Sequence, residues 1–139
     1  MIHFFFENIA EFVLETELKE KLEHIITSEG KKLGEINYIF CDDEYLLKVN
    51  QDYLQHDYYT DIITFDYVKG KVISGDIFVS VERVEDNAQS LSKDFQSEFH
   101  RVLAHGILHL CGYKDKSPED EQLMREKEDF YINAMKSLF

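Results

Sequence analysis

The stretch from His105 to Asp115 constrains the local fold of this 139-residue chain more than any other. His105 and His109 are four residues apart, so on an α-helix their side chains lie one turn apart on the same face. Gly112 follows, and glycine readily adopts the left-handed conformation that ends many helices. We therefore predict a helix followed by a turn at Gly112, which brings Asp115 back beside the two imidazoles.

Two imidazoles and one carboxylate form a typical ligand set for a catalytic transition metal, most simply one Zn²⁺ per chain. Three protein ligands leave the fourth position open for water, which separates a catalytic site from a closed structural one. We predict that His105, His109 and Asp115 hold this metal. The alternative is that both histidines are hydrogen-bonded residues near a core. Cys111 points off the histidine face, which argues against it as a further ligand.

The spacing H-x-x-x-H-x-x-G-x-x-D also resembles that of the metalloproteases, in which a glutamate follows the first histidine and serves as general base. Gly106 occupies that position here and carries no side chain that could accept a proton. A metallopeptidase-like hydrolase would therefore need an unusual base. It stays open as an alternative.

Length and composition favour one folded domain over residues 1–139, with 44% hydrophobic residues to build a core. No apolar run is long enough to cross a bilayer, and residues 1–7 lack a basic leader and a cleavage site. We therefore expect a cytoplasmic protein with no membrane partner. Cys41 and Cys111 form no C-x-x-C pair, so we expect two buried free thiols in a reducing compartment.

The charge balance argues against a nucleic-acid partner. Twenty-eight acidic and 15 basic residues give a net charge of −13, which repels a polyanion at long range. Nucleic-acid-binding proteins usually carry a basic patch. A local basic rim could still form here from four scattered lysines: Lys69, Lys71, Lys114 and Lys116.

Hydrophobic periodicity predicts an α+β fold, with a single small mixed sheet of about four strands packed with helices. Strands are expected at about 2–6, 36–40 and 62–67, and then at 72–73 and 77–79 after a turn at Gly70. Helices are expected at about 12–28, from Asp42 or Asp43 to 53, and at 81–91, 95–110 and 118 to near the end.

The last predicted helix has strong signals at its start. Ser117 is a good N-cap and Pro118 a good first residue. Its apolar stripe is expected to pack in the core, and consists of Leu123, Phe130, Ala134 and Leu138.

Three stretches of the chain match the motifs of a known family in the same order. Residues 105–115 match most of the signature H-G-x-L-H-L-x-G-Y-D-H, including Gly106. Residues 50–65 resemble Asn-x-x-Tyr-Arg followed by Asp and by Pro-Thr-Asp-Val-Leu-Ser-Phe, and residues 75–77 match Gly-Asp-Ile. Through these motifs the chain resembles the YbeY-type rRNA maturation endoribonucleases, which are zinc-dependent. The resemblance covers nearly the whole chain.

The resemblance implies a single-strand-specific, metal-dependent endoribonuclease. It implies a role in 3′-end maturation of small-subunit rRNA and in ribosome quality control, with rRNA, the ribosome and ribosomal proteins as partners. Two positions depart from the family. Asp115 replaces a histidine ligand, which leaves a competent zinc site but makes the bound water less acidic and could favour Mn²⁺. Leu54 replaces an arginine, and leucine cannot clamp a phosphate. His56, Lys48 or a rim lysine could substitute for it.

In the expected mechanism the metal lowers the pKa of bound water and polarises a phosphoryl oxygen. The general base stays open between Asp61, Asp76 and His56, and the two aspartates are equally suited to capping or turn roles. A further alternative is a non-catalytic ribosome-assembly factor, in which the metal only ties the C-terminal region to the sheet. Leu54 and the acidic charge balance keep that alternative open.

Overall fold

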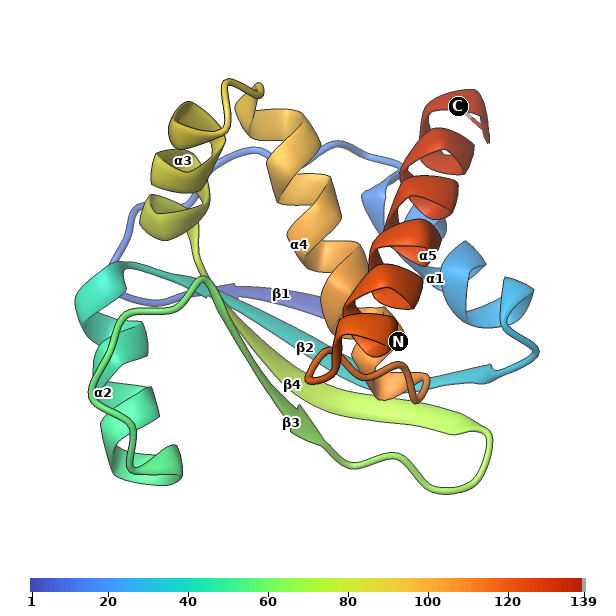
Figure 1. Ribbon diagram of the computed structural model, residues 1–139, viewed down its shortest axis with the longest axis horizontal. Helices are drawn as coiled ribbons and strands as arrows, with labels where there is room; N and C mark the ends of the chain where they lie inside the picture. Colours follow the sequence, from blue (N-terminus) through green and yellow to red (C-terminus); the bar gives the residue numbers. More distant parts are fainter. Residues whose placement is uncertain (139) are drawn as a thin grey trace.

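The structure is a computed structural model that describes residues 1–138, with side chains through residue 136. Over these residues the chain forms five helices around a four-stranded sheet, so the predicted α+β class is confirmed (Figure 1). The strands are β1 (Ile2–Phe6), β2 (Lys32–Cys41), β3 (Ile62–Asp66) and β4 (Val72–Ser80). The helices are α1 (Leu18–Ser28), α2 (Asp43–Leu54), α3 (Val81–Ser90), α4 (Phe95–Leu110) and α5 (Pro118–Leu138).

The sheet is mixed, with the strand order β1-β2-β4-β3. β1, β2 and β4 run parallel, whereas β3 forms an antiparallel hairpin with β4. The hairpin register places Ile62 opposite Val79, and the amide of Ser80 donates to the carbonyl of Asp61 at 2.9 Å. The start of β3 therefore lies at the same edge of the sheet as the carboxyl ends of the parallel strands.

Alternation along the strands supplies two apolar faces. The larger core lies between the sheet and helices α1, α3, α4 and α5, which Figure 1 shows grouped on one side of the strands. Its fully buried side chains include Tyr38, Phe40, Ile77, Leu103 and Ile107. Helix α2 packs on the opposite face, where Leu46 and Ile63 belong to a second, smaller cluster.

Gly106 lets α4 pack closely on the sheet. A Cβ atom at this position would lie 3.1 Å from Ile62 Cδ1 and 3.1 Å from two side-chain carbons of Ile77. A glutamate here would also bury a carboxylate against β3 and β4, at a cost of several kcal/mol. The close packing at Gly106 thus keeps the neighbouring His105 beside the start of β3.

Helix α1 begins later than predicted. The expected start near Phe12 is wrong, because residues 11–15 are irregular and the helix begins at Leu18. The Phe12 ring instead packs 5.9 Å from Phe40 and 6.2 Å from Phe99, measured between centroids. These tertiary contacts override the local helical pattern. Two further differences are small: β2 begins at Lys32, and residues 72–80 form one continuous strand.

Helix α5 begins as predicted, with the Ser117 hydroxyl accepting from the Asp120 amide at 3.1 Å. Its predicted core stripe is wrong at two positions, because Leu123 is 45% exposed and Phe130 is 61% exposed, whereas Ala134 is half-buried. The side chain of Leu138 lies outside the described residues. The face that packs inward instead carries Met124, Glu128, Tyr131, Ile132 and Met135. Apolar periodicity misses this face because it contains a buried carboxylate.

Candidate metal centre

The turn predicted after α4 is present. The helix ends at Leu110, and Gly112 adopts a φ of 111°, in the left-handed region that favours glycine. The amide of Gly112 donates to the carbonyl of His109 at 3.0 Å, and that of Tyr113 donates to the carbonyl of Leu108 at 3.1 Å. These bonds satisfy carbonyls at the helix end and return the chain toward the histidine face.

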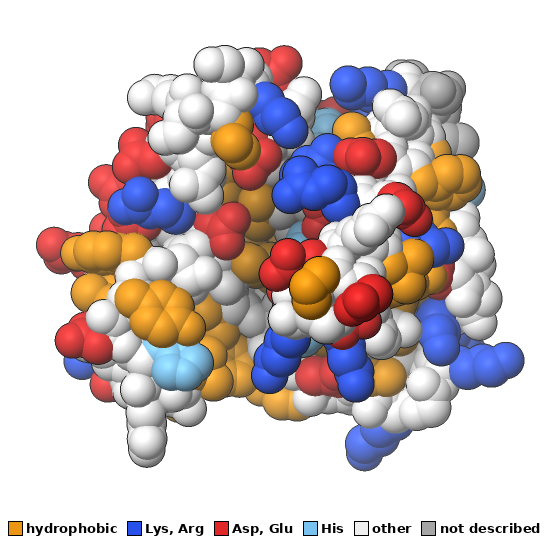
Figure 2. Space-filling model, in the orientation of Figure 1, with side chains coloured by type: hydrophobic (Ala, Val, Ile, Leu, Met, Phe, Trp, Pro, Cys, Tyr) orange, Lys and Arg blue, Asp and Glu red, His pale blue; other side chains and the backbone are white. Residues whose placement is uncertain are grey.

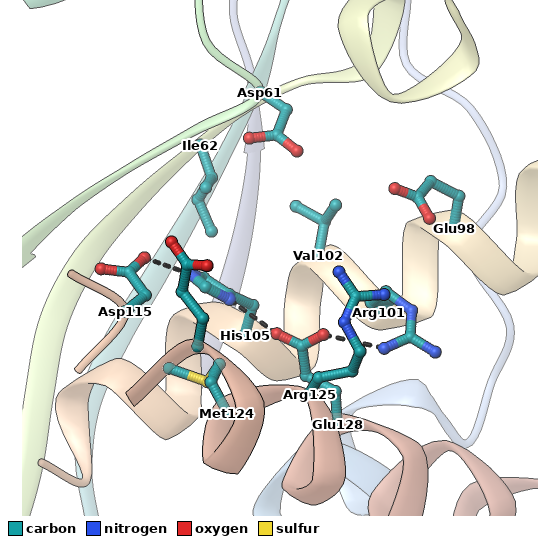
Figure 3. Close-up of a pocket in the computed structure, with 11 residues that line it drawn as sticks. Asp61, Ile62, Glu98, Arg101, Val102, His105, Asp115, Met124, Arg125 and Glu128 are labelled. Carbon is teal, nitrogen blue, oxygen red and sulfur yellow. Dashed lines mark hydrogen bonds and ion pairs between the residues drawn. The ribbon is translucent and has the colours of Figure 1, made fainter. Parts of the chain in front are cut away.

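The return places Asp115 beside His105, with Oδ2 of the aspartate 3.2 Å from Nε2 of the imidazole (Figure 3). His109 lines the same cavity as these two residues. The structure thus brings the three predicted ligands to one cavity wall. They do not form a closed ligand set, because no group of three or more His, Cys, Asp or Glu in the described part of the chain is arranged to hold an ion. Their joint coordination of a metal stays a prediction.

Glu128 fixes the orientation of His105. The imidazole Nδ1 lies 2.7 Å from Glu128 Oε2, and because a carboxylate only accepts, Nδ1 carries the hydrogen. Arg101 donates to the other oxygen of Glu128 at 2.8 Å and to Asp129 at 2.5 Å (Figure 3). This chain of contacts leaves Nε2 of His105 facing Asp115 and the cavity. It is the arrangement that orients many metal-binding histidines.

The charges around His105 also change its protonation. Burial alone would lower the pKa of the imidazole, but the hydrogen bond and charge of Glu128, with the charges of Asp115 and Asp61, raise it above its usual value. The ring lies between two carboxylates, with Nδ1 2.7 Å from Glu128 and Nε2 3.2 Å from Asp115. A cation bound at Nε2 competes with a proton for that nitrogen.

Two cavities meet at His105 and Asp115. The first, here called the α5 cavity, measures about 240 Å³ and is lined by residues of α4 and α5 and by the start of β3. The second, the α2 cavity, measures about 220 Å³ and reaches across β3 to the end of α2 and the loop after it. Both are lined by Ile62, His105 and Asp115. The candidate metal centre therefore has room for a ligand on either side.

The three candidate general bases lie in different places. Asp61 lines the α5 cavity; burial raises the pKa of its carboxyl group, partly opposed by the nearby His105. His56 lines the α2 cavity. Asp76 accepts from the Asn37 amide at 3.0 Å and from the Tyr67 hydroxyl at 3.3 Å, and it lines neither cavity. Asp76 therefore has a structural role, and Asp61 is the best placed of the three.

Of the residues proposed to replace the family arginine, His56 lines the α2 cavity, whereas Lys48 and the four rim lysines line neither cavity. Leu54 lines the α2 cavity, so this departure lies within the site. Lys48 pairs with Asp52 at 3.7 Å. Among the described residues that line the two cavities there is no lysine, and the basic residues are Arg101 and Arg125 of the α5 cavity.

The thiols differ from each other. Cys41 is fully buried, as predicted, but Cys111 is only half-buried because it follows the end of α4. Burial, with a smaller contribution from the Glu29 charge, raises the pKa of the Cys111 thiol to about 11. The thiol is therefore protonated at neutral pH, whereas metal binding requires the thiolate.

Sequence reasoning missed five charged residues of the α5 cavity. They are Glu98, Arg101, Glu121, Arg125 and Glu128. Glu98 is 6% exposed, and its Oε1 has no hydrogen-bond partner among the described residues. One signal was available: Glu98, Val102, His105 and His109 follow helical spacing on one face of α4. Glu128 and Arg125 required knowledge of how α5 packs on α4.

Comparison with known proteins identifies the family. The family model described as Endoribonuclease YbeY matches residues 4–136. The chain belongs to the YbeY endoribonuclease family. It is similar to the YbeY endoribonucleases of Flavobacterium johnsoniae, at 62% identity over 93% of each chain, and of Cytophaga hutchinsonii, at 52% identity over 96% of this chain and 95% of the relative.

The fold comparison agrees with the family comparison. A solution structure of a protein from Thermotoga maritima matches with a TM-score of 0.72 and 33% sequence identity, over 97% of this chain and 89% of the other. The predicted membership of the YbeY family, and with it an endoribonuclease, is confirmed. In the described part of the chain no helix combines the length and apolarity needed to cross a membrane.

Proposed function

We propose that this chain is a single-strand-specific, metal-dependent endoribonuclease that acts in 3′-end maturation of small-subunit rRNA and in ribosome quality control. Family membership and the names of the relatives support an RNA substrate. The main structural support for this proposal is the environment of His105. Its Nδ1 is hydrogen-bonded to Glu128, and its Nε2 lies 3.2 Å from Asp115 Oδ2.

The donor chemistry fits one Zn²⁺ per chain held by His105, His109 and Asp115. Two imidazole nitrogens and a carboxylate suit zinc, and the contact of Glu128 with His105 is typical of metal-binding histidines. When bound, zinc makes water more acidic and polarises a phosphoryl oxygen. The carboxylate of Asp115 makes Mn²⁺ a second suitable ion.

The residues of the chain supply binding and proton transfer. Asp61 lies in the α5 cavity next to the centre, and burial raises the pKa of its carboxyl group toward the working range of a general base. We assign it to take the proton of the attacking water. His105 is kept in place by Glu128, so its imidazole does not turn away from the cavity during the reaction.

An acidic protein can bind single-stranded RNA through base stacking. The rings of His56 and Tyr58 stack with centroids 5.1 Å apart and an interplanar angle of 21°, and both side chains are exposed at the α2 cavity. Stacking of a base on an aromatic ring contributes about 1–3 kcal/mol and requires no positive charge. Figure 2 shows acidic and basic side chains interspersed around a hollow.

The wider setting follows from the same proposal. Residues 1–139 form one hydrolase domain, which works in the cytoplasm with the ribosome and its proteins as partners. A partner that presents the rRNA end would offset the net charge of −13, which slows encounter with free RNA.

Cleavage assays on three substrates test the function. Zinc-loaded protein is expected to cut single-stranded RNA, to leave duplex RNA intact and to lose activity on chelation or with His109→Ala. Cleavage of peptides alone would instead favour a metallopeptidase. Full cellular function of metal-free protein, together with loss of folding in His109→Ala, would favour a non-catalytic assembly factor.

A further inference from the structure

The chain has three arginines, and two of them are neutralised within the fold. Arg83 pairs with Asp43 at 2.6 Å and with Asp86 at 3.4 Å. Arg101 pairs with Glu128 at 2.8 Å and with Asp129 at 2.5 Å.

Arg125 is the third arginine, and it forms no ion pair or hydrogen bond with any described residue. It extends from α5, and Figure 3 shows its guanidinium reaching into the α5 cavity with no dashed line to a neighbour. The side chain is exposed, so a ligand can reach it from solvent. His105 and Asp115 line the same cavity. The structure therefore places one guanidinium without an ion-pair or hydrogen-bond partner among the described residues beside the candidate metal centre.

The ligand that suits this guanidinium is a phosphodiester. Its planar fork can donate two parallel hydrogen bonds to two phosphate oxygens. Asp61, Glu98 and Glu121 line the same cavity and repel an anion, and Arg101 is already neutralised. A phosphate entering the α5 cavity thus has Arg125 as its available cationic side chain.

The position of Leu54 gives this arrangement a further consequence. Leu54 lines the α2 cavity, which shares His105 and Asp115 with the α5 cavity that Arg125 lines. The α2 cavity offers the stacked rings of His56 and Tyr58 but no Lys or Arg among its described lining residues. The two cavities therefore suit different parts of one strand, a base on the α2 side and a phosphate on the α5 side.

We propose that Arg125 binds a backbone phosphate of the RNA next to the one that is cleaved, and so supplies from α5 the phosphate contact that Leu54 cannot. This inference rests on the proposed function. Arg125 holds and positions the strand and takes no part in proton transfer. Its loss raises KM more than it lowers kcat.

Binding and kinetics of Arg125→Gln test the proposal. The zinc-loaded protein is titrated with fluorescein-labelled, phosphorothioate-substituted single-stranded RNA at several salt concentrations, and kcat and KM are measured on cleavable RNA. Losing a charge-assisted hydrogen-bond pair should weaken binding roughly 10- to 100-fold. The slope of log Kd against log salt should fall by about 0.7, the value for one phosphate contact on a single strand. Arg125→Lys should keep that slope and recover part of the affinity.

Lys136→Gln is the matched control, because Lys136 is an exposed cation on the same helix and lines neither cavity. It should bind RNA as the wild type does. The proposal is overturned if Arg125→Gln keeps wild-type affinity and salt slope, or if Lys136→Gln lowers both equally, which would show a general charge effect. If the wild-type protein neither binds nor cuts RNA, the proposed function itself fails, and the role of Arg125 fails with it.

Discussion

Glu128 of α5 and His105 of α4 are joined by a hydrogen bond of 2.7 Å between Oε2 and Nδ1. Arg101 donates to the second oxygen of the same carboxylate, so Glu128 is fixed on both sides. The last helix of the chain thereby sets the orientation of the first proposed metal ligand. The geometry of the candidate metal centre therefore depends on the packing of α5 on α4.

Glu128→Gln should weaken zinc binding roughly 10- to 100-fold, the usual effect of removing the carboxylate behind a histidine ligand. The amide keeps the size of the side chain but loses the charge that favours hydrogen on Nδ1. Competition with a chromophoric chelator measures the affinity. Glu126→Gln, an exposed change on the same helix, is the control. Equal zinc affinity in both variants would show that Glu128 does not support the centre.

The sequence predicted the local part of the site because that part depends on helical spacing and one turn. His105 and His109 lie on the same helix. The short segment that turns at Gly112 returns Asp115 toward them. Glu128 and Arg125 could not be predicted in the same way. Their positions depend on how α5 packs against α4, which no local pattern records.

In the fold too, local sequence patterns predicted some features and missed those that depend on tertiary packing. Alternating apolar residues predicted the strands, and caps predicted the starts of α2 and α5. The start of α1 failed because Phe12 packs into the core from an irregular segment. The predicted buried face of α5 was wrong because two rows of apolar residues run along this helix. The row that is buried includes Glu128, whereas Phe130 of the other row is exposed.

Tyr58→Ala should weaken binding of single-stranded RNA by about 1–3 kcal/mol, because it removes an aromatic face on which a base can stack. The slope of log Kd against log salt should stay unchanged, since no phosphate contact is lost. Fluorescence anisotropy at several salt concentrations measures both quantities. Tyr58→Phe keeps the ring and should bind nearly as the wild type does. A similar loss in Tyr58→Phe would argue against stacking.

Glu29 should make stability depend on pH. Its carboxylate accepts from the hydroxyls of Tyr113, at 2.6 Å, and of Tyr131, and Lys127 lies 3.5 Å away. Burial alone would raise the pKa of Glu29, but these hydrogen bonds and the charge of Lys127 together lower it below 4.5. The stability they contribute is therefore present above the unfolded-state pKa and is lost as the pH falls through the folded-state pKa.

Glu29→Gln should therefore cost about 1 kcal/mol near neutral pH, the difference between charged and neutral hydrogen bonds. That difference should vanish in acid below the folded-state pKa. Urea denaturation at the two pH values measures it. Glu23→Gln, an exposed change on α1, should cost little at either pH. A deficit in Glu29→Gln that persists unchanged in acid would rule out the charge of Glu29 as its source.

The metal content of the purified protein tests the central claim most directly. Elemental analysis by mass spectrometry should find one transition-metal ion per chain in the wild type. Asp115→Ala and His109→Ala, checked for folding by circular dichroism, should retain much less. A wild-type chain that binds no transition metal after zinc loading and removal of free ion, or folded variants that each keep one ion, would contradict a centre built from His105, His109 and Asp115.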